Sequence, residues 1–289
     1  MTDVTGQYPL RAENVSAIVT GFALQAYKLK QLCMVETSSA WQETYYREGK
    51  AELTGGTGSA VRGIPRLAAF PYGEPNYTKL SSYMEKYGME GDVSWEDEKT
   101  NNFGVISRTL LRIGRAVANA VDIQIESSIR TASGVNTVAI AAGSAWNSAT
   151  VANRDPIQDL LNAKREMAID NYDPDEGNSF VVLNPKDYSN LLGNSKVVNN
   201  PTFKAADVVS NGVVGQIVGL KIIVSNTVTV SRAYVVKAKE ALTWKEAMAL
   251  NVETINDPMI KKTIRAAEIG VAQVTNPEAI VVISNTDEA

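Results

Sequence analysis

The residues from Gly58 to Gly63 have the spacing of a loop that binds phosphate groups. They read GSAVRG, which matches the opening G-x-x-x-x-G of a nucleotide-binding P-loop. That motif continues with a lysine that reaches the outer phosphates and a hydroxyl that holds the metal ion. Here Ile64 and Pro65 follow instead, and proline also removes a backbone N–H that an anion would need. The sequence therefore argues against phosphate chemistry at this loop, and a nucleotide-binding α/β enzyme is the weaker alternative.

The chain contains no histidine and a single cysteine, Cys33. These counts exclude a Ser-His-Asp triad, a Cys-His pair, any histidine metal site and an intrachain disulfide. Cys33 lies in the apolar stretch LKQLCMV, which is typical of a small core residue rather than of a nucleophile. We therefore predict no catalytic residue in this chain.

An acidic stretch, EGDVSWEDEK, offers the hard oxygen ligands that a divalent cation would take. Its carboxylates are Glu90, Asp92, Glu96, Asp97 and Glu98. The stretch lacks the regular ligand spacing and the glycine of a calcium loop. A solvated helix start, or a charged surface that contacts another subunit, is the favoured interpretation. The acidic residues of NYDPDEGNS belong to ordinary turn chemistry, so we predict no metal and no cofactor.

Length and composition indicate a folded protein of one large or two modest domains. The chain has 289 residues, of which 44% are hydrophobic and 21% charged, with a formal net charge of −4. An acidic balance disfavours a protein whose main task is to grip nucleic acid. No apolar run approaches the roughly 20 residues of a membrane span, and the N-terminus lacks the pattern of a secretory signal. We therefore expect synthesis and use in a cytoplasm, or in something assembled there.

One long helix is the clearest element that the sequence predicts. Seven apolar residues recur at steps of three and four, namely Ile106, Leu110, Ile113, Val117, Val121, Ile125 and Ile129. A helix over residues 102–130 would be about 40 Å long, which suits a structural spine better than a catalytic turn. Just before it, Ser94 with Asp97 and Glu98 predicts a capped helix start.

The remaining elements alternate between helices, strands and one long loop. Residues 12–32 predict an arm that becomes helical, broken at Gly21, which an isolated subunit would not bury well. A strand pattern near residues 41–46 leads into the loop 49–79, which is rich in glycine and proline. Asp155 and Pro156 predict a helix start, and a strand, a second short helix and further strands follow. The tail predicts three closing strands, LNVETIND, TIRAAEIGVAQV and EAIVVISN.

The order of these elements resembles the major capsid proteins of tailed double-stranded DNA viruses, which have the α+β fold called Hong Kong 97-type. The resemblance rests on the arm, the extended loop, DVSWEDEKTNNFGVISRTLLRIGRAVANAVD, FVVLNPKDYSNLL, GQIVGLKIIVSNTV, AYVVKAKEALTW and IRAAEIGVAQVTNPEAIVVI. It implies five regions. They are an N-terminal arm (1–35), an extended-loop region (36–90), a first part of the peripheral domain with the spine helix (91–140), an axial domain (141–235) and closing strands of the peripheral domain (236–289).

The resemblance implies a shell subunit rather than an enzyme. Such subunits gather into hexamers and pentamers and form an icosahedral virion shell in the host cytoplasm. The shell confines packaged double-stranded DNA without specific binding, and neither a cofactor nor a membrane takes part. No charged helical segment of about 100 residues reads as a fused scaffold, so a separate scaffold or none is implied, with portal and decoration proteins as further candidate partners. An encapsulin-like nanocompartment shell, which would enclose an enzyme, is the alternative of the same fold.

The charges of the extended loop suggest where it docks. Residues 49–79 carry four basic residues, Lys50, Arg62, Arg66 and Lys79, against two acidic ones, a net +2. Residues 84–98 carry six acidic residues against one lysine, a net −5. Opposite fields of this kind steer and register a contact. We therefore predict that these four cations contact the acidic stretch of a neighbouring subunit.

Overall fold

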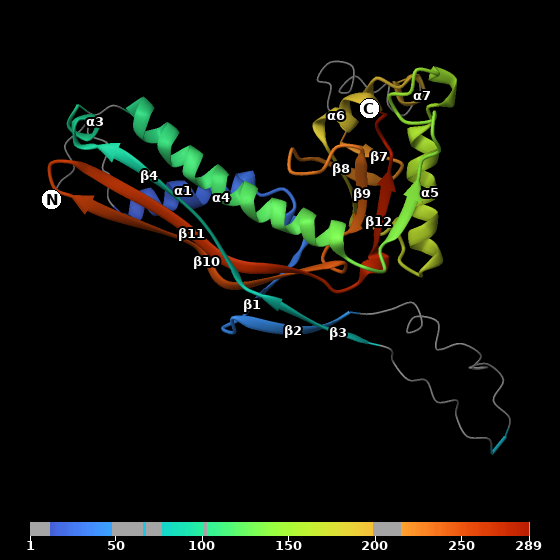
Figure 1. Ribbon diagram of the computed structural model, residues 1–289, viewed down its shortest axis with the longest axis horizontal. Coiled ribbons are helices and arrows are strands. Elements are labelled where there is room, and N and C mark those ends of the chain that lie inside the picture. Colours follow the sequence, from blue (N-terminus) through green and yellow to red (C-terminus); the bar gives the residue numbers. More distant parts are fainter. Residues whose placement is uncertain (1–11, 48–65, 68–76, 101–102, 199–214, 289) are drawn as a thin grey trace.

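The computed structural model describes residues 12–47, 66–67, 77–100, 103–198 and 215–288. The molecule is elongated (Figure 1), with a long sheet and two helices at one end and a six-stranded sheet with its own helices at the other. A two-stranded ribbon lies along the lower edge of this view. Both helical and extended elements predicted from the sequence are therefore present in one α+β chain.

The long sheet has four strands in the order β1-β10-β11-β4. Their bounds are β1 Met34–Thr37, β10 Leu242–Asp257, β11 Lys261–Val274 and β4 Glu85–Ser94. β1 runs parallel to β10, and the other neighbours are antiparallel. The stretch AYVVKAKEALTW divides between two sheets, because a turn with Lys239 at φ 66° separates β9 from β10.

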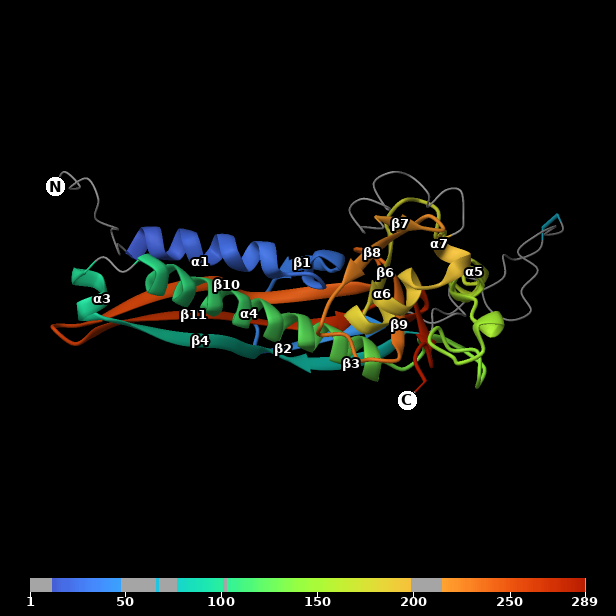
Figure 2. The same cartoon turned by 90° about the horizontal axis from the view of Figure 1, so that it is seen from above.

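Two helices cover one face of this sheet (Figure 2). They are α1 (Ala12–Ala26) and the long α4 (Phe103–Thr131). The predicted spine helix is thus confirmed to within a residue at each end, and all seven residues of its apolar stripe are buried. The short α3 (Trp95–Lys99) precedes it, and the Ser94 hydroxyl accepts the backbone N–H of Asp97 as the predicted cap.

The N-terminal helix packs on its own subunit, which corrects the expectation that an isolated chain would not bury the arm. Val15, Val19 and Ala23 are fully buried beneath α1, in contact with the apolar stripe of α4. Gly114 on α4 permits this close approach, since a Cβ there would lie 2.9 Å from the Val19 carbonyl oxygen. Gly21 lies within the helix with open space around it and does not interrupt it.

The six-stranded sheet has the order β5-β12-β9-β6-β8-β7. Its strands are β5 Asn136–Ala139, β12 Ile280–Ser284, β9 Arg232–Lys237, β6 Ser179–Leu183, β8 Leu220–Val224 and β7 Gln216–Ile217. The resemblance implied that the last strand belongs with the closing strands of the peripheral domain. β12 instead lies in the six-stranded sheet and does not join the long sheet. β12 is an unbroken apolar run, IVVIS, and its first four residues are buried, which fits a position between two other strands of a covered sheet.

Helices with the predicted caps accompany the six-stranded sheet. They are α5 (Pro156–Ile169), α6 (Pro185–Leu192) and α7 (Ser195–Val198), with 3-10 turns at Val151–Asn153 and Pro277–Ala279. The Asp155 carboxylate accepts the N–H of Gln158, and the Asn184 side chain accepts the N–H of Lys186. The sequence prediction of both helix starts is therefore confirmed.

The long helix α4 joins the two hydrophobic cores. Its first half, represented by Leu110 and Ile113, packs in a core with α1 and the long sheet. Its second half, represented by Val121 and Ile125, packs in the core that the six-stranded sheet shares. One continuous helix thus couples both ends of the molecule, as a structural spine requires.

The third sheet is the ribbon of β2 (Gln42–Arg47) and β3 (Thr78–Tyr83), which pair antiparallel. Arg47 fastens this ribbon to the rest of the subunit, because its guanidinium donates to the Val274 carbonyl oxygen at 3.3 Å and to the Ser133 hydroxyl at 2.8 Å. The extended loop 49–79 therefore leaves and returns through an anchored ribbon.

Candidate functional site

The predicted acidic stretch lies along the edge of the long sheet and the start of α3. Glu90 and Asp92 are exposed on β4, and Glu98 is in α3. Each of the three pairs with a cation of the neighbouring β11. The pairs are Glu90 with Arg265 at 2.6 Å, Asp92 with Lys261 at 2.8 Å and Glu98 with Lys262 at 2.5 Å. The hydrogen bonds from Lys261 and Thr263 lower the pKa of Asp92 below its ordinary range.

The other two acidic residues serve the short helix. Asp97 accepts a hydrogen bond from the Ser94 hydroxyl at 2.9 Å, which completes the cap of α3. Glu96 is exposed in the first turn, where the helix dipole favours a negative charge. The interpretation of this stretch as a solvated helix start thus holds for Glu96 and Asp97, while its role between subunits stays a prediction.

The four predicted basic partners are only partly described. Lys79 is exposed on β3, opposite Tyr46, and Arg66 is exposed in a short turn. Lys50 and Arg62 lie outside the described residues, as does the stretch from Gly58 to Gly63. Their contact with the acidic stretch of another subunit therefore stays a prediction.

The cations that neutralise the acidic stretch could not be found by scanning that stretch alone. Lys261, Lys262 and Arg265 follow it by about 170 positions, and only the β11–β4 pairing brings them alongside. The outer face of this sheet nevertheless keeps an acidic excess. At the paired positions it presents four carboxylates, Glu90, Asp92, Glu253 and Asp257, against the three cations Lys86, Lys261 and Arg265.

A buried carboxylate anchors the segment that follows α1. Asp122 on α4 accepts the backbone N–H groups of Lys28 at 2.9 Å, Leu29 at 3.0 Å and Lys30 at 3.2 Å. Burial raises the pKa of Asp122 above its ordinary value, although these three bonds act in the opposite direction. The turn between α1 and β1 is therefore held by one side chain of the spine helix.

A second polar cluster lies close by, where the same turn meets the long sheet. Lys30 forms ion pairs with Glu268 at 2.6 Å and Glu246 at 2.9 Å, and Tyr27 donates a hydrogen bond to Glu268. Burial alone would lower the pKa of Lys30, but its bonds to the two carboxylates raise it overall. Because every member has a partner, the cluster fits a structural role at the junction of the two ends rather than acid–base catalysis.

Exposed apolar side chains occur at two places on the subunit, the β10–β11 turn and the β2–β3 ribbon. At the β10–β11 turn, Met259 and Ile260 are 81% and 60% exposed. On and beside the β2–β3 ribbon, Trp41 and Tyr83 are 66% and 65% exposed. Exposed apolar side chains at these two places are suited to contacts with other subunits.

Within the described residues, no group of three or more Asp, Glu or Cys side chains has a geometry that could hold a metal ion. Among those same residues, no helix has the length and apolarity to cross a bilayer. Cys33 is buried and unpaired, and burial raises the pKa of its thiol, so the prediction of a core residue is confirmed.

The two sheets, the spine helix and the ribbon together are similar to known proteins. The model of the phage capsid protein family matches residues 78–283, which include β3, β4, α4 and the six-stranded sheet except for Ser284 at the end of β12. The chain belongs to the phage capsid protein family. Membership indicates a major capsid protein that forms a virion shell, a structural role, and it does not favour the nanocompartment alternative. No curated protein sequence matches the chain.

Solved structures show that this capsid protein has the Hong Kong 97-type fold. The capsid of cyanophage P-SCSP1u matches with a TM-score of 0.65 at 16% identity, covering 98% of this chain and 92% of that one. A virus-like particle from Pyrococcus furiosus matches with a TM-score of 0.63 at 14% identity, covering 94% of this chain and 98% of that one. The mature capsid of bacteriophage PhiM1 matches with a TM-score of 0.62 at 14% identity, covering 100% of this chain and 91% of that one. The fold predicted from the order of elements is therefore confirmed.

Proposed function

We propose that copies of this capsid protein assemble into hexamers and pentamers that close an icosahedral shell around double-stranded DNA. The family match across both sheets carries this proposal. Assembly takes place in the host cytoplasm, without an enzymatic step by this chain, and a separate scaffold, a portal and decoration proteins are candidate partners. The shell retains the genome by confinement, since the net charge of −4 opposes tight binding.

The two ends of the subunit take different places in this shell. The six-stranded sheet with α5 and α6 is the axial domain, which gathers around the five-fold and six-fold axes. The long sheet with α1 and α4 is the peripheral domain, which reaches neighbouring capsomers. Because β5 and β12 pair within the six-stranded sheet, we include both in the proposed axial domain and shift its proposed boundaries at residues 141 and 236 accordingly.

Sedimentation velocity of the purified chain tests the assembly directly. We expect a single slow species at low protein concentration and a fast-sedimenting closed particle above a threshold, because each subunit contact is weak and closure is cooperative. Nucleic acid in the particles separates a virus shell from an enzyme-filled compartment. A chain that stays slow at every concentration, with a melting temperature that rises on addition of ATP, would support the nucleotide-binding enzyme instead.

Reversing two charges of the extended loop should slow assembly without unfolding the subunit. In the variant Arg62→Glu/Arg66→Glu, the loop would repel the acidic outer face of a neighbouring long sheet. We expect an unchanged melting temperature and a several-fold slower rise of light scattering at low salt, with a smaller effect at high salt because added ions screen the repulsion.

A matched control for this variant is Lys221→Glu/Lys239→Glu, which makes the same change in net charge on the six-stranded end. Each exposed pair contributes only about 0.2 to 1 kcal/mol, so the rate of assembly is the informative quantity. If the loop variant assembles as fast as the wild type in low salt, the steering role of these arginines is wrong. Shape and apolar contacts such as Trp41 and Tyr83 would then have to guide the contact.

A further inference from the structure

The outward face of the spine helix carries arginines and no carboxylate. Arg108, Arg112 and Arg115 are exposed on successive turns of α4. The only acidic residues of this helix, Asp122 and Glu126, are both buried. None of the three arginines forms an ion pair within the described part of the chain, in contrast to the paired cations of β11. These three residues are called the arginine stripe below.

The described side chains of the neighbouring elements do not neutralise the arginine stripe. The described side chains of α1, from residue 14 to residue 26, include no ionisable group, and the next exposed charge is Lys28. Asp122 faces the same side, but its two oxygens are occupied by the three backbone N–H groups of residues 28–30. Among the described side chains, this face of the subunit therefore carries cations and no carboxylate that is free to pair with them.

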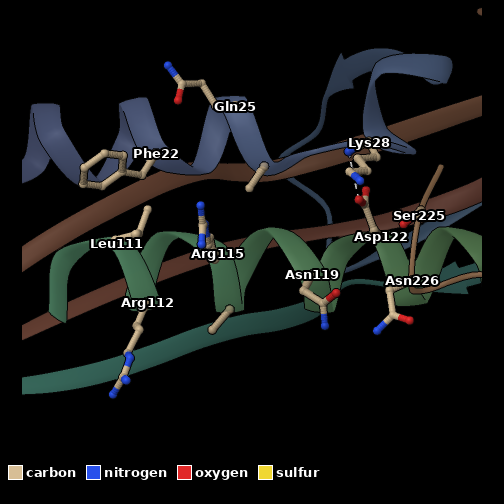
Figure 3. A pocket seen from close by; sticks show the side chains of 12 residues that line it. Phe22, Gln25, Lys28, Leu111, Arg112, Arg115, Asn119, Asp122, Ser225 and Asn226 are labelled. Carbon is tan, nitrogen blue, oxygen red and sulfur yellow. Dashed lines mark hydrogen bonds between the residues drawn. The ribbon is translucent and has the colours of Figure 1, made fainter. Parts of the chain in front are cut away.

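The stripe borders a groove between α1, α4 and the turn after β8 (Figure 3). The groove has a volume of about 720 Å³, and Arg112, Arg115 and Lys28 are among the residues that line it. Figure 3 shows Arg115 extending toward α1 and Arg112 extending away from it. The neutral lining side chains Gln25, Asn119, Ser225 and Asn226 add hydrogen-bond donors that suit phosphate oxygens.

We propose that the arginine stripe contacts the phosphate backbone of the packaged double-stranded DNA, and that this face of the long sheet lines the inside of the shell. The inference rests on the proposed function, since it concerns the genome that the shell encloses. Arg108 and Arg115 lie about 10 Å apart along the helix axis, which matches about three phosphates of one DNA strand. The opposite face of the sheet, with its acidic excess, would repel DNA and faces outward.

The contact reads no sequence and is weak for one subunit. Arginine side chains on an open helix face reach phosphates without entering a groove of the duplex, so they carry no base information. Three charge contacts per subunit are few, but the many copies in a closed shell together hold the outer layer of DNA against the wall. This agrees with an acidic protein that confines DNA rather than gripping it.

The salt dependence of DNA binding tests the proposal. The probes are two fluorescent 20-base-pair duplexes of unrelated sequence, and the protein is the full chain at concentrations where it sediments as single subunits. Three phosphate contacts predict a slope of about −2.7 in log K against log salt, or about a 40-fold loss of affinity between 50 and 200 mM. We expect equal affinities for both duplexes and a nearly flat salt dependence for Arg108→Gln/Arg112→Gln/Arg115→Gln.

The matched control is Lys86→Gln/Lys221→Gln/Lys239→Gln, which removes the same charge from exposed positions on other faces. It should keep the wild-type slope. If the triple arginine variant loses its fold by circular dichroism, the single variants Arg112→Gln and Arg115→Gln replace it, each with an expected change in slope of about 0.9.

An unchanged slope in the arginine variants, or an equal loss in the control, would overturn the proposal. If the slope is unchanged and assembly also fails in the arginine variants, the stripe is instead a protein-binding surface for an acidic scaffold or a second copy. These outcomes are distinct from failure of the proposed function, in which the wild-type chain would form no shell whatever its DNA affinity.

Discussion

Deletion of residues 1–34 should leave a chain that no longer folds stably. The deletion removes four large apolar side chains that are at most 1% exposed, namely Val15, Val19, Leu29 and Leu32. Burial of each contributes about 1.5 to 3 kcal/mol, so the loss is roughly 6 to 12 kcal/mol, which is comparable to the whole stability of a typical domain. The apolar face of α4 would also become exposed.

Equilibrium unfolding in urea measures this effect, with a chain that begins at Ala12 as the control. The control keeps α1 complete and should unfold at the wild-type midpoint. We expect the longer deletion to aggregate or to show no cooperative transition. A cooperative transition at the wild-type midpoint would mean that the N-terminal helix docks only after assembly, as the sequence pattern around Gly21 first suggested.

Replacement of Asp122 by alanine should destabilise the subunit by about 3 kcal/mol, because three backbone N–H groups lose their acceptor at once and one of them is fully buried. The melting temperature should fall by on the order of 10 °C. The turn between α1 and β1 would lose its attachment to the spine helix, so amide hydrogen exchange of Lys28, Leu29 and Lys30 should accelerate more than that of β12.

Two further variants make this result specific to the hydrogen bonds. Asp122→Asn keeps one acceptor oxygen and should lose about 1 kcal/mol. Asn119→Ala, which removes an exposed side chain one turn earlier on α4, should change stability by less than about 0.5 kcal/mol. If Asp122→Ala and Asn119→Ala have the same melting temperature, the turn is held by apolar packing of Leu29 and Leu32 instead of by the carboxylate.

The elements that the sequence predicted well are those with local signals. The spine helix shows a complete apolar stripe, and α5 and α6 begin with a capping side chain followed by proline. These signals depend on residues that are close together in the chain, so a single sequence is enough to recognise them. The same holds for Cys33, whose apolar neighbours indicated the core.

The features that the sequence did not predict depend on contacts between distant segments. α1 docks on α4 because Gly114 lacks a Cβ, and that glycine lies about 90 positions after the helix it admits. β12 joins the six-stranded sheet through pairing with β5 and β9, which its own buried apolar run does not specify. Periodicity shows that a face is buried, but not against which partner.

The candidate surfaces divide in the same way. The acidic stretch was visible in the sequence, but its neutralising cations on β11 and the uncompensated arginines on α4 become evident only when helix faces and strand register are known. A net charge of −4 hides this separation, because it sums two faces of the long sheet that carry opposite signs. The net charge of the whole chain therefore predicts weak DNA binding. The distribution of charge over the two faces of the long sheet predicts where DNA makes contact.

An electron cryomicroscopy reconstruction of particles assembled from the purified full chain tests the central claim most directly. We predict closed icosahedral shells in which the six-stranded sheets cluster around five-fold and six-fold axes, and in which the helices α1 and α4 face the interior. Single subunits or small open oligomers under all assembly conditions would contradict the shell function, and closed shells with the α4 face outward would contradict the assignment of the arginine stripe to the genome.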